Sequence, residues 1–74
     1  MDEPLQEFDV VALLNDIPEY ELFAGQTGAV VYVHDGGEAF EIEFPLTARR
    51  SLVVSVVRNQ LLKLKGQLYS RAGI

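Results

Sequence analysis

Residues 24–44, AGQTGAVVYVHDGGEAFEIEF, carry the clearest structural pattern in this chain. Residues 40–44 alternate apolar and acidic side chains, which is typical of a half-buried β-strand. The pair Gly36-Gly37 lies before this run, and glycine adopts the positive φ angles that both central positions of a type I′ turn require. The stretch therefore predicts a β-hairpin with Gly36-Gly37 at its tip.

This tip fixes the partners across the hairpin. One face would be wholly apolar, pairing Val33 with Phe40, Val31 with Ile42, and Ala29 with Phe44. The other face would be mixed, pairing Tyr32 with Glu41 and Val30 with Glu43. A tip at Asp35-Gly36 would change the partners but keep the two faces, whereas a three-residue loop would need a bulge to recover them.

The composition predicts one small, folded domain. The chain has 74 residues, of which 49% are hydrophobic, and no run approaches the roughly 18 apolar residues of a membrane span. Its start, MDEPLQEF, is acidic and polar, unlike a signal peptide, so we expect a cytoplasmic protein. The absence of cysteine excludes disulfides. Because a core of this size contributes only about 3–5 kcal/mol, oligomerisation or a bound partner is expected to supplement it.

Charge is divided along the chain. Residues 1–44 hold all eleven acidic residues, and residues 45–74 hold all six basic ones, for a net charge of −5. Such asymmetry suggests an interaction surface or tail. The alternative is that interleaved strands mix the charges in space, and the sequence leaves both open.

The first part of the chain predicts one strand and a long loop. Residues 8–14, FDVVALL, are interpreted as the first strand, with a short helix over residues 4–14 as the alternative. Residues 15–18, NDIP, are typical of a turn because Pro18 forces the preceding residue out of the α region. They would begin a loop, ending at residue 26, that three apolar side chains hold against the domain. These are Tyr20, Leu22 and Phe23.

The last part of the chain predicts two further strands. Residues 52–57, LVVSVV, favour a central strand that is covered on both faces. A short turn at residues 58–60 would lead to a closing strand at 61–65. The fold class expected is all-β, a small SH3-like five-stranded β-barrel spanning residues 8–65 with a long first loop and a Gly-Gly hairpin. Residues 1–7 and 66–74 would be flexible or loosely packed tails.

A set of short motifs in this order resembles a known family. The motifs are DVVALL (9–14), IPE (17–19), GQTG (25–28), VV (30–31), Val33, EIEF (41–44) and NQLL (59–62). Their order resembles the bacterial family catalogued as domain of unknown function 4926, over roughly residues 8–65. The resemblance implies a stand-alone SH3-like barrel with no catalytic residues to carry over. It also implies one half of a two-gene pair, such as an antitoxin or immunity protein. Tyr32 and the basic tail depart from the family pattern.

Side chains capable of catalysis are few. His34 is the single histidine, and beside a turn it lacks the convergent ligands that zinc requires, so we expect a solvated residue. Glu41 and Glu43 share a strand face, but nothing in the sequence buries them to tune acid–base chemistry. The serines have no evident base. We expect no enzyme, and therefore no catalytic, metal or cofactor site and no small-molecule substrate.

A protein partner is the favoured interpretation. Val30 and Tyr32 would lie on the outer face beside Glu43 and Glu41, giving an apolar centre with an acidic rim, as in protein interfaces. An acidic surface would also steer a basic partner, such as a nuclease toxin. A homo-oligomer that uses the same face, or the exposed part of residues 52–57, is equally compatible.

The alternative is a barrel that binds nucleic acid through a basic patch. The candidates are Arg49, Arg50, Arg58, Lys63 and Lys65. The pI of 4.6 argues against this function, because a field of eleven acidic residues repels phosphates. The sequence therefore predicts a non-enzymatic protein-interaction module, with nucleic-acid binding on the Arg49/Arg50/Arg58 side as the alternative.

Overall fold

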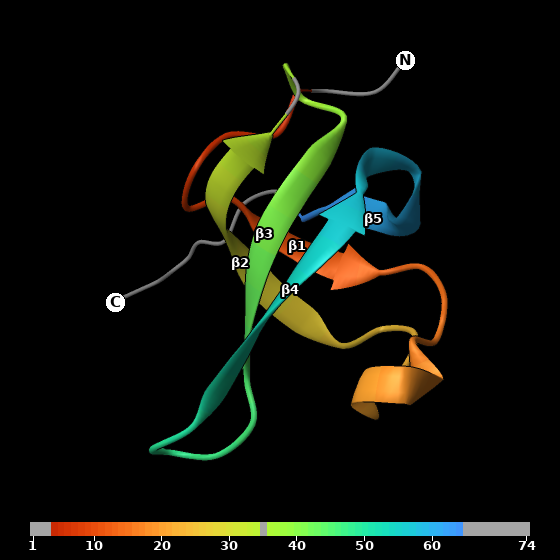
Figure 1. The fold of residues 1–74 in the computed structure, drawn as a ribbon, viewed down its shortest axis with the longest axis vertical. Coiled ribbons are helices and arrows are strands. Elements are labelled where there is room, and N and C mark those ends of the chain that lie inside the picture. The colour runs from red at the N-terminus through yellow and green to blue at the C-terminus, as the bar shows by residue number, and fades with distance from the viewer. Residues whose placement is uncertain (1–3, 35, 65–74) are drawn as a thin grey trace.

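The computed structural model describes residues 4–34 and 36–64 of the chain. These residues form five strands and two short 3₁₀ helices (Figure 1). In chain order they are β1 (Val10–Leu13), η1 (Pro18–Tyr20), β2 (Thr27–His34), β3 (Ala39–Pro45), β4 (Ser51–Val57), η2 (Arg58–Gln60) and β5 (Leu61–Lys63). The all-β prediction is confirmed, and the start of the chain forms a strand rather than the alternative helix.

All five strands belong to one antiparallel sheet in the order β4-β3-β2-β1-β5. Strands β2, β3 and β4 follow one another as hairpins, and β5 returns to pair with β1. Figure 1 shows the sheet strongly coiled, with the β3–β4 loop projecting at the lower left. Within the described residues, β4 and β5 are the two edges and do not pair with each other. The sheet is therefore not closed into a barrel by hydrogen bonds.

The register of the β2–β3 hairpin matches the prediction near the tip and departs from it further away. Val33 faces Phe40 and Tyr32 faces Glu41, as predicted. A bulge between Val30 and Tyr32 then shifts the pairing by one residue. The other three predicted pairs are therefore wrong: Val30 faces Ile42, and Ala29 faces Glu43.

The bulge decides which side chains of β2 enter the core. Because one extra residue lies between Val30 and Tyr32, Val30 turns to the same side as Val33. Val30 is fully buried, with 0% of its surface exposed, so its predicted position on the outer face is wrong. Val31 is half-buried.

The core draws on every strand and on two segments outside the strands. One of them is Leu5, which the sequence placed in a loose tail and which is buried. The other is the long first loop, where Leu22 is fully buried but Tyr20 and Phe23 are about half exposed, so one of the three predicted contacts holds the loop. The buried core cluster consists of Leu5, Val11, Leu13, Leu22, Val30, Phe40, Ile42, Phe44, Val54, Val56 and Leu61.

Gly28 lies on β2, directly against β3. A Cβ atom on Gly28 would lie 2.7 Å from the carbonyl oxygen of Glu43 and 2.8 Å from Cγ2 of Ile42. Such distances leave no room for a side chain. The glycine therefore permits the close packing of the two strands.

Strand β4 is an edge strand, so the prediction of a central strand covered on both faces is wrong. Val54 and Val56 are buried, whereas Val53 and Val57 are half exposed. An apolar run with period-2 geometry points alternate residues to opposite faces, and only one face of β4 meets the core.

Phe8 is an unusual residue just before β1. Its φ angle is +75°, and 77% of its surface is exposed. Its backbone N–H donates to the carbonyl of Val30 at 2.6 Å, which continues the pairing of the chain with β2 beyond Val10. A bulky residue with positive φ is strained, because its Cβ crowds the backbone.

Some predictions fall outside the described residues. Gly36 and Gly37 have φ angles of +65° and +104°, but residue 35 is not described, so the turn type stays a prediction. Lys65 and the predicted tail at 66–74 are likewise outside the described residues. None of the described helices has the length and apolar character needed to cross a membrane.

Candidate functional site

The candidate site is the side of β2, β3 and β4 that faces away from the core, which we call the outer face. Residues that pair directly across antiparallel strands point to the same side of the sheet, so the registers define its three rows. The rows are Ala29–Glu43–Val53, Tyr32–Glu41–Ser55 and His34–Ala39–Val57.

Apolar and acidic side chains alternate on the outer face. Tyr32, Val53 and Val57 have 53%, 52% and 50% of their surface exposed, so about half of each is accessible to another molecule. Glu41 lies beside Tyr32, and Glu43 lies beside Val53. The surface thus combines apolar contact area with carboxylates that favour positive charge.

Tyr32 packs against His34, which in turn contacts Glu41. The rings of Tyr32 and His34 meet edge to face, with centroids 4.6 Å apart and planes at 61°. Nε2 of His34 lies 2.8 Å from Oε2 of Glu41, within hydrogen-bonding distance. His34 is the last residue of β2 and is half-buried, so the expected solvated turn residue is instead part of this cluster. A tyrosine has only two side-chain torsions, so it loses little conformational freedom when a partner covers it.

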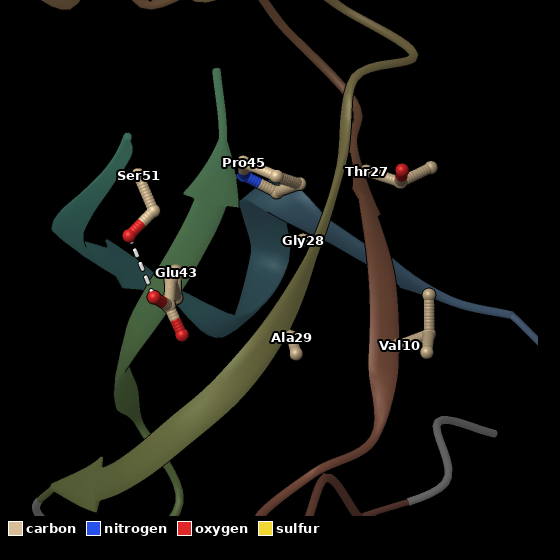
Figure 2. A pocket seen from close by; sticks show the side chains of 7 residues that line it. All are labelled: Val10, Thr27, Gly28, Ala29, Glu43, Pro45 and Ser51. Atoms are coloured by element: carbon tan, nitrogen blue, oxygen red, sulfur yellow. Dashed lines mark hydrogen bonds between the residues drawn. The ribbon is translucent and has the colours of Figure 1, made fainter. Parts of the chain in front are cut away.

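An open hollow of about 430 Å³ adjoins the outer face. Figure 2 shows Ser51 of β4 and Val10 of β1 on opposite sides, with Glu43 and Ala29 between them. The Ser51 hydroxyl donates to Oε2 of Glu43 at 2.6 Å. The residues that line the hollow are Val10, Thr27, Gly28, Ala29, Glu43, Pro45 and Ser51. With apolar walls and one carboxylate, it is suited to an apolar or cationic side chain of a partner.

The two outer-face carboxylates have separate partners. Glu41 contacts His34, and Glu43 accepts from Ser51. Within residues 4–34 and 36–64, no group of three or more His, Cys, Asp or Glu side chains could hold a metal ion.

The structure brings together three of the four predicted partner-binding residues, Tyr32, Glu41 and Glu43. Val30 lies in the core beneath them. Val53 and Val57 belong to the site, and sequence reasoning missed them. The sequence does indicate their position, because Ser51 and Ser55 lie on the same face of the strand as Val53 and Val57. Serine is typical of a face that is exposed to solvent.

The predicted basic residues are spread over the molecule. Arg49 and Arg50 precede β4 and Arg58 follows it, so the strand separates them by about 25 Å at 3.3 Å per residue. Arg58 donates from Nη1 to the carbonyl of Leu61 at 2.8 Å. Lys63 Nζ lies 3.5 Å from Oδ2 of Asp9. The described members of this set therefore do not form one compact patch.

A single antiparallel sheet with one half-exposed face defines a small all-β domain. The sequence model of the family described as Domain of unknown function (DUF4926) matches residues 7–48, which is more than half of the chain. The chain belongs to this family, as its motifs predicted. The match includes β1, the long first loop, β2 and β3. None of the curated proteins and none of the solved structures matches the chain.

Proposed function

We propose that this protein is a non-enzymatic protein-binding module that contacts its partner through the outer face. The observation that carries the proposal is the half-exposed trio Tyr32, Val53 and Val57 beside Glu41 and Glu43. Protein interfaces typically place aromatic and apolar anchors at the centre and charged residues around them. The Tyr32 ring is the anchor in this proposal.

We also propose that the fold is an SH3-like barrel with a Gly-Gly hairpin. Three features support it: a meander of β2, β3 and β4, a last strand that returns beside the first, and a 3₁₀ turn before that last strand. Gly36 and Gly37 have the positive φ angles of a type I′ turn, whereas the N–H groups of Gly37 and Glu38 both donate to the carbonyl of His34. SH3-like barrels host many functions, so the fold itself does not select the partner.

The partner in this proposal is a basic protein, and the chain is the neutralising half of a bacterial pair of the antitoxin or immunity type. The net charge of −5 and the carboxylates of the outer face support a basic partner, because complementary charge accelerates encounter. A nuclease toxin is one partner with this charge. Nucleic acid is the less supported ligand, because β4 separates Arg49 and Arg50 from Arg58.

Affinity capture from a lysate of the source bacterium tests the proposal. The baits are the unaltered protein, Tyr32→Asp, and Tyr20→Asp as a matched control, since Tyr20 is 48% exposed on the distant 3₁₀ helix. Each lysate is divided, and one half is treated with nuclease. We expect one basic protein in stoichiometric amount in both halves, lost with Tyr32→Asp and retained with Tyr20→Asp.

Two results would contradict the proposal. Equal retention by both tyrosine variants would remove the outer face from the binding site. A capture that disappears with nuclease, and with Arg50→Glu, would establish nucleic-acid binding instead.

A further inference from the structure

We propose that β4 pairs with β4 of a second copy of this chain, forming a two-fold symmetric dimer with one continuous sheet. The inference goes beyond the proposed function, because it concerns the edge of the sheet rather than its outer face. It rests on the backbone groups of β4, on the side chains that flank them, and on the distribution of charge along the β3–β4 ribbon.

Alternate backbone groups of β4 point away from β3. The N–H of Leu46 donates to the carbonyl of Arg50, and the N–H of Arg58 donates to the carbonyl of Glu38. Antiparallel strands alternate between residues that bond to the neighbour and residues that do not. Even-numbered residues of β4 therefore face β3, and the N–H and C=O groups of Ser51, Val53, Ser55 and Val57 point to the open edge.

Among residues 4–34 and 36–64, this edge carries none of the usual protections against pairing. Edge strands in natural proteins are commonly short, bulged, or interrupted by charged residues or proline. Strand β4 is seven residues long, contains only serine, leucine and valine, and pairs with β3 without a register shift. The opposite edge strand, β5, is only three residues long. Within the described residues, β4 is thus the long regular edge that is suited to pairing.

Charge favours a second copy as the occupant. Arg49 and Arg50 flank the start of β4, whereas Glu38 and Glu41 lie on β3 or next to it near the end of β4. An antiparallel dimer places the basic end of each copy beside the acidic end of the other. Strands lie about 4.8 Å apart, so an arginine that flanks β4 would lie about 10 Å from β3 of the second copy. Extended arginine and glutamate side chains can span that distance.

The same charges select the register. A two-fold axis at Val54 would set Arg50 directly opposite Arg58 of the second copy, which is unfavourable for like charges. An axis at Val53 sets Arg50 opposite Val56, which pairs with Phe40, so that Arg50 meets no like charge across the new edge. Both axes join groups that point to the open edge, since Val53 would face Val53 in one and Ser55 in the other, so the like charges decide between them. We therefore place the axis at Val53.

Single-cysteine variants test this register directly, because the chain has no cysteine of its own. Hydrogen-bonded antiparallel residues have Cα atoms about 5.5 Å apart, which a disulfide can span. Val53→Cys should therefore form a covalent dimer at least tenfold faster than Val57→Cys under mild oxidation. The two valines are equally exposed, but two copies of residue 57 would lie about 27 Å apart. Equal rates, or faster dimerisation of Val57→Cys, would overturn the proposed register.

Sedimentation analysis of the cysteine-free protein tests the dimer itself. We expect a concentration-dependent dimer of the unaltered protein and at least a tenfold weaker one for Val53→Pro. Proline at this position removes a donor at the open edge without removing a hydrogen bond to β3, and edge strands tolerate proline there. Val53→Thr keeps the N–H and should dimerise normally, and circular dichroism checks that both variants fold. Ser55→Lys, a charged interruption of the edge, should also weaken the dimer.

The proposal fails if the unaltered protein stays monomeric up to millimolar concentration. It also fails if Val53→Pro and Ser55→Lys both fold and dimerise as well as the unaltered protein. A protein that is monomeric alone, yet loses a captured partner with Val53→Pro, would assign the edge to a strand of that partner and exclude the second copy.

Discussion

Gly28 shows how one missing side chain shapes the sheet. It is buried between β2 and β3, and a Cβ atom would lie within 3 Å of backbone and side-chain atoms of β3. The glycine is needed here for space, unlike Gly25, which has a φ angle of +90° and open surroundings. Gly28 is therefore required because a side chain would not fit, and Gly25 because its backbone has a positive φ angle.

We predict that Gly28→Ala lowers the free energy of unfolding by about 1–3 kcal/mol, the usual range for overpacking a core. In a domain of this size each kcal/mol lowers the melting temperature by about 4–8 °C. Thermal unfolding followed by circular dichroism measures the change. Gly25→Ala should show only the cost of a left-handed residue, about 1–2 kcal/mol. An unchanged melting temperature for Gly28→Ala would show that β2 and β3 can separate without cost.

Phe8 combines a strained backbone with a large exposed ring. Its φ angle of +75° suits asparagine better than phenylalanine, and its ring is 77% exposed. We predict that Phe8→Asn raises the free energy of unfolding by about 0.5–1 kcal/mol, because it relieves part of this strain. Phe23→Asn is the control, since Phe23 is also exposed and its φ angle is not positive. Chemical denaturation of the three proteins gives the comparison, and equal stability of all three would refute the strain.

Among the connecting elements, the long first loop has one fully buried side chain, Leu22, and a partly buried one, Ile17, that packs against the core. Leu22 enters the core, and its backbone pairs with Ile17 to close the turn around η1. Tyr20 and Phe23 lie on either side of it and remain about half exposed.

We predict that Leu22→Ala destabilises the protein by about 2–5 kcal/mol, as for other buried leucines. Tyr20→Ala and Phe23→Ala should each change stability by less than about 0.5 kcal/mol, because their rings are not packed in the core. Urea denaturation of the three variants makes the comparison. A small effect for Leu22→Ala would mean that Ile17 and the hydrogen bonds of the loop hold it without Leu22.

The strands also show what the sequence could and could not predict. Strand β3 was predictable because residues 40–44 alternate strictly, and the pairs next to the tip followed from the glycines. The bulge was not predictable, because residues 29–33, AVVYV, are apolar at both odd and even positions. The pattern is therefore the same with or without an extra residue. The position of β4 at an edge was not predictable either, because residues 52–57 do not indicate which strands lie beside them.

For the molecule as a whole, folding only partly mixes the two charged halves of the chain. Asp9 and Lys63 pair across β1 and β5, whereas Glu41, Glu43, Arg49 and Arg50 stay on or beside the β3–β4 ribbon. The candidate site was predictable as far as its acidic residues and Tyr32. Its apolar residues, Val53 and Val57, could not be assigned without the strand order, because they are exposed only when β4 lies at the edge of the sheet.

We predict that binding of a basic partner slows with salt, by about tenfold in association rate between 50 and 500 mM NaCl, because screening shortens the range of attraction. Glu41→Gln combined with Glu43→Gln should slow association further, as measured by stopped flow or surface plasmon resonance. Glu19→Gln combined with Glu21→Gln changes the charge equally in the distant loop and should have a smaller effect. Equal effects of the two pairs would assign the attraction to net charge rather than to the outer face.

The bulge in β2 also has an evolutionary consequence. Removing Val31 from the chain would leave Val30 opposite Ile42 and Tyr32 opposite Glu41, so every neighbouring side chain would keep its face. Removing a residue from a regular strand turns the following part over and exchanges core and surface. Insertions and deletions are usually confined to loops, but here the interior of a strand can lose one residue. Relatives with a β2 one residue shorter would be expected to have a straighter strand and the same core.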